Sequence, residues 1–142
     1  MDLNSVYTDL IMHHNNKKEN KGELEDPDLS EHGHNPNCGD DITLDLKIED
    51  EIIKEAVFHG SGCAISQAST SIMIDLIKGK SVEEALELVE TFIKMIKKEI
   101  DDKEKLKKLK DARALQNISN MPARVKCAVL SWHTLKEALN HN

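Results

Sequence analysis

Three cysteines and one nearby aspartate are the residues of this chain best suited to binding a metal ion or reacting as nucleophiles. They are Cys38, Asp40, Cys63 and Cys127. Thiolate sulfur and carboxylate oxygen together form a donor set that zinc accepts in a tetrahedron, and an all-protein shell of this kind is typical of structural zinc. Iron is the alternative, because iron–sulfur clusters are also held chiefly by thiolates. If the four residues converge, they form one site with three sulfur ligands and one oxygen ligand.

The number of cysteines argues against a disulfide framework. One of the three thiols would be left over, and residues 1–5 lack the basic and apolar regions of a signal peptide. Because the cytosol keeps thiols reduced, we expect a cytoplasmic protein whose cysteines bind metal or take part in thiol chemistry. Each cysteine taken alone also fits the interpretation of a small buried apolar residue. The flanking residues favour the metal or thiol interpretation.

Composition excludes several classes of function. The 142 residues suffice for one domain with a buried core, which we expect to span residues 1–142. The formal net charge of −7 argues against binding to nucleic acid, since phosphate recognition needs a basic face. No apolar run approaches the roughly 20 residues that span a bilayer, so we expect no contact with a membrane.

An alternating pattern predicts the strand that follows the Cys38 segment. Over residues 42–48 every second residue is a branched apolar one, which is the period of a strand with one buried face. After a charged turn, the β-branched and aromatic run over residues 52–58 predicts a second strand and an antiparallel hairpin. The second strand returns to the end of the sheet where the first began. The hairpin therefore brings Cys63 beside Cys38.

Helical spacing of apolar residues predicts four helices, at about 5–15, 65–78, 81–96 and 119–139. The lysine-rich stretch 94–110 is expected to be a solvated helical face. A polar residue before Pro122 is expected to cap the last helix. Its predicted buried stripe consists of Ala128, Trp132, Leu135 and Leu139.

Four histidines are expected to lie at the surface or in loops. His13 and His14 come near the end of the first helix, where an imidazolium suits the helix dipole. His32 and His34 flank Gly33 in a predicted loop, and their alternative interpretation is as outer-shell or adventitious metal ligands.

Two cysteines have neighbours that favour an anionic sulfur. Cys63 follows Gly60 and Gly62 and lies at or just before the start of a helix, where free N–H groups and the dipole favour a thiolate. Arg124 precedes Cys127 by one helical turn, so we expect its guanidinium near the sulfur. A fixed positive charge there would help to hold a thiolate or another anionic sulfur species.

Four segments together resemble the IscU/NifU N-terminal iron–sulfur scaffold family, in order along nearly the whole chain. They are Asn35-Pro36-Asn37-Cys38-Gly39-Asp40, Gly60-Ser61-Gly62-Cys63-Ala64-Ile65-Ser66, Ile77-Lys78-Gly79-Lys80 and Pro122-Ala123-Arg124-Val125-Lys126-Cys127-Ala128. The SufU branch is the more similar one. Lys126 stands where IscU has a histidine, segment 121–125 replaces the chaperone-binding Leu-Pro-Pro-Val-Lys motif, and the stretch from about 92 to 115 matches the SufU insertion.

The resemblance implies an α+β fold in which helices cover a small antiparallel sheet, and a zinc site made by Cys38, Asp40, Cys63 and Cys127. It also implies that Cys38 accepts persulfide sulfur from a SufS-like cysteine desulfurase and passes it into the SUF iron–sulfur assembly machinery. Arg124 would stabilise the site or the bound persulfide. The alternative is a scaffold on which an iron–sulfur cluster is assembled. A third interpretation is a zinc ion that only staples loops to the sheet.

Overall fold

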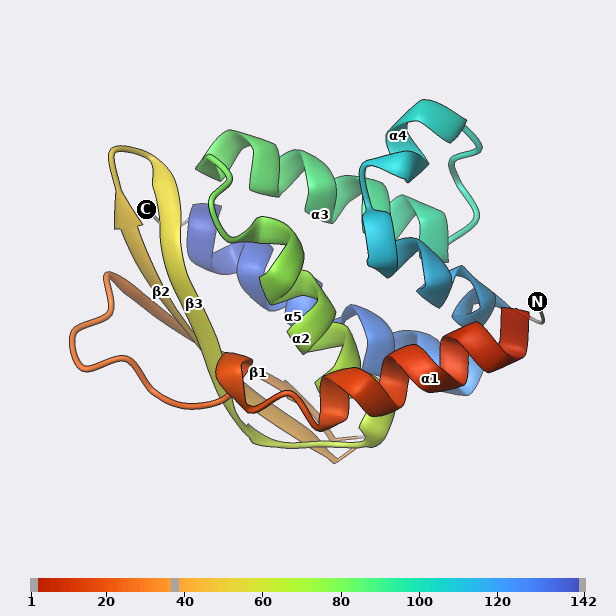
Figure 1. Cartoon of the computed structure of the whole chain (residues 1–142), viewed down its shortest axis with the longest axis horizontal. Coiled ribbons are helices and arrows are strands. Elements are labelled where there is room, and N and C mark those ends of the chain that lie inside the picture. The colour runs from red at the N-terminus through yellow and green to blue at the C-terminus, as the bar shows by residue number, and fades with distance from the viewer. Residues whose placement is uncertain (1–2, 37–38, 141–142) are drawn as a thin grey trace.

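The structure is a computed structural model that describes residues 3–36 and 39–140, with side chains from residue 8 onward. A sheet forms one side of the molecule and the helices pack against it (Figure 1). In chain order the elements are α1 (Leu3–Asn15), the 3-10 helix η1 (Lys18–Asn20), β1 (Leu29–Asn35), β2 (Asp40–Glu49), β3 (Ile52–Ser61), α2 (Ala64–Ile77), α3 (Val82–Ile96), α4 (Lys103–Lys107), the 3-10 helix η2 (Lys110–Asn120) and α5 (Pro122–Asn140). This is the predicted α+β fold with a small antiparallel sheet.

The predicted hairpin is present as β2 and β3. The two strands pair antiparallel, with Asp41 opposite Ser61 at the end that leads to α2. At the other end the turn residues Asp50 and Glu51 have φ values of 52° and 67°, which is the left-handed conformation that tight hairpin turns require. The hairpin therefore places the start of β2 beside the start of α2, as the sequence predicted.

Strand β1 corrects the prediction of a loop around His32 and His34. The segment pairs antiparallel with β2 and forms the third strand of the sheet. Its buried positions are Gly33 and Asn35 rather than large apolar residues, so the sequence lacks the alternation that marks a strand. Gly33 is needed because α5 lies against it: a Cβ there would overlap the hydroxyl of Thr134.

Helix α1 docks on α2 through a buried polar group, which corrects the expectation that His14 lies at the surface. The His14 side chain is 3% exposed, and its Nδ1 lies 2.7 Å from Ser71 Oγ. Burial lowers the pKa of His14 below its ordinary value of 6.5, although the nearby Asp75 carboxylate opposes this shift. Asn20 donates hydrogen bonds to the carbonyl and hydroxyl oxygens of the same serine, at 3.2 and 2.9 Å.

The core lies between the sheet and the helices. Helix α2 contacts β3, and α5 contacts β1 and β2 as well as α2. The predicted α5 stripe is buried throughout. Trp132 of this stripe stacks on Phe92 of α3 with ring centroids 3.8 Å apart, and its Nε1 donates to Ser69 Oγ at 2.9 Å. Ser69 Oγ donates in turn to the Ala128 carbonyl at 2.6 Å, which fixes α5 against α2.

The segment before α5 differs from the prediction. Helix α5 begins at Pro122, and residues 110–120, which include the predicted capping residues, form the 3-10 helix η2 instead. The lysines between 94 and 110 are exposed, as predicted, while Leu106 and Leu109 anchor the stretch in the core. Among the described residues, no helix is long and apolar enough to cross a membrane.

Candidate metal centre

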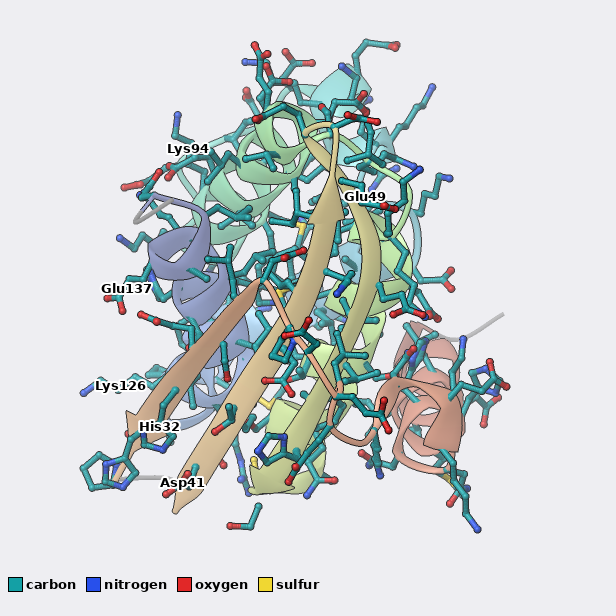
Figure 2. The ribbon with its side chains drawn as sticks, turned by 90° about the vertical axis from the view of Figure 1, so that its left-hand side faces the viewer. His32, Asp41, Glu49, Lys94, Lys126 and Glu137 are labelled. Atoms are coloured by element: carbon teal, nitrogen blue, oxygen red, sulfur yellow. The ribbon has the colours of Figure 1, made fainter. Side chains whose placement is uncertain are left out.

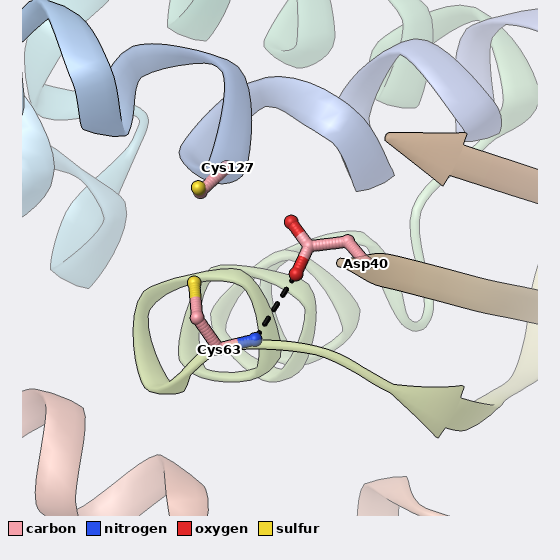
Figure 3. A group of neighbouring side chains, drawn as sticks. All are labelled: Asp40, Cys63 and Cys127. Carbon is pink, nitrogen blue, oxygen red and sulfur yellow. Dashed lines mark hydrogen bonds between the residues drawn. The ribbon is translucent and has the colours of Figure 1, made fainter. Parts of the chain in front are cut away.

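Three of the four predicted ligands lie together where a strand and two helices meet. Asp40 is the first residue of β2, Cys63 is the N-cap of α2, and Cys127 lies in the second turn of α5. One ligand atom from each of the three lies within 4.8 Å of the others, and the side chains point toward one another (Figure 3). Cys38 lies outside the described residues.

The carboxylate of Asp40 is fully buried and only partly satisfied. Its Oδ1 accepts a hydrogen bond of 3.0 Å from the backbone N–H of Cys63, drawn as the dashed line in Figure 3. Its Oδ2 has no hydrogen-bond partner among the described residues, and the residue is 0% exposed. A buried polar atom without a partner costs about 1–3 kcal/mol, and more when it is charged. A cation beside Oδ2 would remove this cost, so the carboxylate fits the role of a metal ligand.

Gly62 provides the space that the carboxylate occupies. A Cβ at this position would lie 2.6 Å from Asp40 Oδ1 and 3.3 Å from Ser66 Oγ. Any larger residue would therefore push the carboxylate away from the Cys63 N–H. The neighbouring Gly60 has a different role, because its φ of +128° and its approach to the Asp41 carbonyl belong to the strand end. Gly60 therefore has a conformational role, whereas Gly62 has a packing role.

Cys63 occupies the helix N-terminus that the sequence predicted. It is half-buried, and its Sγ accepts a hydrogen bond of 3.4 Å from the backbone N–H of Ser66. Sulfur carrying negative charge is the better acceptor at a helix N-terminus. The start of α2 therefore fixes the position of Cys63, while the half-buried side chain leaves its sulfur accessible to a ligand.

Cys127 lies on the inner side of α5 and is 2% exposed. Ser131, one turn later, and Ser66 are also buried, and their hydroxyl oxygens have no hydrogen-bond partner among the described residues. Helical spacing places Ser131 on the same face as Cys127, but the sequence alone gives no role to Ser66. Its only sequence signal is its position in the Gly62–Cys63 motif.

Arg124 is exposed in the first turn of α5, and its backbone N–H bonds to the Met121 carbonyl at 2.8 Å. The contact between its guanidinium and the Cys127 sulfur therefore stays a prediction. Lys126, at the position where IscU has a histidine, is likewise exposed (Figure 2). An exposed ammonium adds positive charge near the site but is not one of the gathered donors.

Two sulfur donors and one buried carboxylate oxygen, with a further cysteine on the β1–β2 connection, suit a tetrahedral zinc ion. The same donors suit iron held by thiolates. Among the described residues, this is the group of histidine, cysteine and carboxylate side chains whose ligand atoms are gathered closely enough for one ion. The gathered donors therefore define a candidate metal-binding site where β2, α2 and α5 meet.

Comparison with known proteins identifies the family. The NifU-like N terminal domain matches residues 6–97, so the chain belongs to the IscU/SufU family of iron–sulfur cluster assembly proteins. The iron–sulfur cluster assembly scaffold protein IscU of Thermotoga maritima is 46% identical over 139 residues, which cover 98% of this chain and 96% of that protein. The zinc-dependent sulfurtransferase SufU of Bacillus subtilis is 42% identical and is covered to 92%, by 97% of this chain.

A solved structure gives the same answer. A crystal structure described as an iron–sulfur cluster assembly scaffold for the SUF system, from Fervidobacterium islandicum AW-1, superimposes with a TM-score of 0.86. It is 37% identical and covers 95% of this chain and 97% of its own. Relatives named as scaffolds and a relative named as a sulfurtransferase therefore both align over nearly the whole chain, and the family alone does not decide between these roles.

Proposed function

We propose that this protein is a zinc-dependent sulfur acceptor, which takes persulfide sulfur from a SufS-like cysteine desulfurase for iron–sulfur cluster assembly by the SUF machinery. The observation that carries the proposal is the buried Asp40 carboxylate beside two cysteines, whose Oδ2 has no hydrogen-bond partner within the described part of the chain. The 42% identity to a relative named as a zinc-dependent sulfurtransferase supports it.

In this proposal Cys38, Asp40, Cys63 and Cys127 hold the zinc ion. A bound zinc ion would keep its cysteine ligands deprotonated and shield them from oxidation. Asp40 would bind through Oδ2, because Oδ1 already accepts the Cys63 N–H. We assign the anchoring role to the other three ligands, because they are fixed by regular elements: Asp40 begins β2, Cys63 caps α2 and Cys127 lies in α5.

Cys38 is the proposed acceptor. Its thiolate attacks the outer sulfur of the desulfurase persulfide, the sulfur–sulfur bond of that persulfide breaks, and the desulfurase cysteine leaves as a thiolate. The products are a persulfide on Cys38 and a free cysteine on the desulfurase, so no external oxidant or reductant is consumed. Arg124 would stabilise the persulfide anion, and its exposed position in the first turn of α5 leaves it available for this.

An iron–sulfur scaffold is the second candidate. The 46% identity to a relative named as a scaffold favours it, and the same cysteines would hold a cluster. Ligation by Asp40 oxygen would make that cluster easier to release than four cysteines would. Anaerobic reconstitution with iron and sulfide tests this candidate: a stable cluster that transfers to an apo-acceptor would support it, and failure to form one would count against it.

The experiment that tests the sulfur-acceptor proposal is cysteine turnover by the cognate desulfurase. The protein is added zinc-loaded, metal-free and as the variant Cys38→Ser. We expect strong stimulation by the zinc form alone. Near-normal stimulation by the Cys38→Ser variant would contradict the assigned acceptor.

The role of Arg124 is tested in the same assay by Arg124→Ala, with Arg113→Ala as a matched control. Both arginines are exposed, but Arg113 lies in η2. We expect reduced stimulation by the first variant and unchanged stimulation by the second. Equal effects would show that general surface charge, rather than Arg124 itself, is responsible.

A further inference from the structure

The outer face of the sheet carries a second group of metal-binding side chains. His32 and His34 lie two residues apart on β1, so their side chains emerge on the same face of the strand. Asp41 of β2 is the residue paired with His34, and directly paired residues share a face. The intervening Gly33 is buried, which shows that this face is the one turned away from the helices.

His32 interacts with each of the other two side chains. His32 Nε2 lies 2.6 Å from Asp41 Oδ1, with both side chains more than half exposed. The His32 and His34 rings stack with centroids 6.3 Å apart and an angle of 16° between their planes. His32 is paired with Thr43, so it reaches Asp41 along the diagonal, toward the end of the sheet where Figure 2 shows both labelled residues.

We propose that His32, His34 and Asp41 form a second metal site, which takes a divalent transition-metal ion such as Ni²⁺ or Zn²⁺. Two imidazoles and one carboxylate are donors that such ions prefer. Exposed side chains can turn without disturbing the core, so rotation of His34 brings its ring nitrogen to an ion held between His32 and Asp41. Water completes the coordination shell. The pairing of His32 with Asp41 alone would add little stability, because both groups are exposed.

An ion bound here would join β1 to β2 close to the point where both strands end. One residue pair, Asn35 with Asp40, lies between the His34–Asp41 pair of the site and the strand ends. The segment between Asn35 and Asp40 contains Cys38. The bound ion would therefore cross-link the two strands that carry the connection to the cysteine site, from the opposite face of the sheet. This proposal is independent of the metal and the reaction at the cysteine site.

Nuclear magnetic resonance with paramagnetic Ni²⁺ tests the site residue by residue. Ni²⁺ is added in substoichiometric amounts to the uniformly ¹⁵N-labelled protein, and the amide signals are followed. We expect selective broadening at residues 32–34 and 41. Because Cys63 and Cys127 lie on the inner side, broadening confined to their signals would instead report the cysteine site and overturn the proposal.

Three variants and one matched control complete the test. His32→Ala, His34→Ala and the nearly isosteric Asp41→Asn should each weaken Ni²⁺ binding by roughly tenfold or more in a calorimetric titration. His59→Ala is the control, because His59 lies on the same face but on β3, with its ring nitrogens near Gly22 and Glu23. We expect it to leave binding unchanged. Binding that survives the three variants, or that is weakened equally by the control, would show that Ni²⁺ only collects on surface histidines.

Discussion

Replacement of Gly62 by alanine separates the geometry of the metal site from the stability of the fold. The alanine Cβ would lie 2.6 Å from Asp40 Oδ1, whereas ordinary contact begins at 3.4 Å, so the carboxylate must move by about 0.8 Å. Functional metal sites hold their ligand distances within about 0.2 Å. The displacement is several times larger than this tolerance and also breaks the hydrogen bond from the Cys63 N–H.

We therefore expect Gly62→Ala to weaken zinc binding by roughly ten- to a hundredfold, the range typical of changes beside metal ligands. This loss corresponds to about 1.4–2.8 kcal/mol of binding free energy. The assay is competition for zinc with a chromophoric chelator of known affinity, and circular dichroism verifies the fold.

Gly79→Ala is the matched control. Gly79 follows α2 with a φ of +83°, and a Cβ there would meet nothing within 4 Å. Its replacement should lower the free energy of unfolding by about 1 kcal/mol through backbone strain while leaving zinc affinity unchanged. Zinc affinity within twofold of the original protein for Gly62→Ala, or an equal loss for Gly79→Ala, would refute the reasoning.

Three further predictions concern buried polar groups. Asp40→Asn should weaken zinc binding but leave the metal-free protein equally or more stable in chemical denaturation. The reason is that it removes a buried carboxylate whose Oδ2 has no hydrogen-bond partner among the described residues. A clear loss of metal-free stability would contradict this. Folding lowers the pKa of His14, so the neutral imidazole's full contribution to folding stability is present above pH 6.5 and is lost as the pH falls below that value. Thermal melts across this pH range should show the loss of stability. His14→Gln, which keeps a polar contact to Ser71, should flatten the pH profile. Trp132→Phe should lower the free energy of unfolding by about 1–3 kcal/mol, because it removes the indole N–H that donates to Ser69 Oγ and some packed volume. An unchanged midpoint in chemical denaturation would refute this.

The elements with regular periods were predictable from the sequence. Alternation predicted β2, a β-branched and aromatic run predicted β3, and helical spacing predicted α3, whose N-cap Ser81 hydroxyl accepts the Glu84 N–H at 3.1 Å. The missed β1 strand has glycine and asparagine at its buried positions, so nothing in its composition distinguishes it from a loop. The strand forms because β2 supplies its hydrogen-bonding partners and α5 packs against it at Gly33.

The missed helix η2 shows a different limit. Its buried residues Ala112, Leu115 and Ile118 recur at every third position, in register with the buried N-cap Leu109. This spacing matches the three residues per turn of a 3-10 helix, but long 3-10 helices are uncommon, so the spacing alone does not predict one. The packing of these residues against α2, α3 and α5 decides the conformation, and such packing is not readable from local sequence.

Hairpin topology predicted that the start of β2, with Asp40, and Cys63 meet at one end of the sheet, because it fixes which strand ends lie together. The approach of Cys127 was implied only by the family resemblance, and Cys38 lies outside the described residues. The environment of Asp40 was not predictable from the sequence. Its burial, and the lack of a hydrogen-bond partner at Oδ2 among the described residues, depend on how Gly62 and the start of α2 pack around it. The buried His14 was missed for a related reason. A histidine near the end of a helix suits solvent, and only the docking of α1 on Ser71 shows otherwise.

A zinc ion at this site could both stabilise the fold and prepare a cysteine for sulfur transfer. The two roles are compatible because the proposed ligands differ in how firmly the fold holds them. Asp40 and Cys127 are buried, and Cys63 caps α2 with its Sγ while its backbone N–H donates to Asp40 Oδ1. Release of any of these three would disturb a strand end or a helix. Cys38 instead belongs to the polar segment between two strands, where the sequence offers no large apolar anchor. Loss of Cys38 from the site would therefore cost less than loss of the other three. We expect Cys38→Ser to retain more zinc than Cys63→Ser or Cys127→Ser, and equal losses in all three variants would contradict this division of roles.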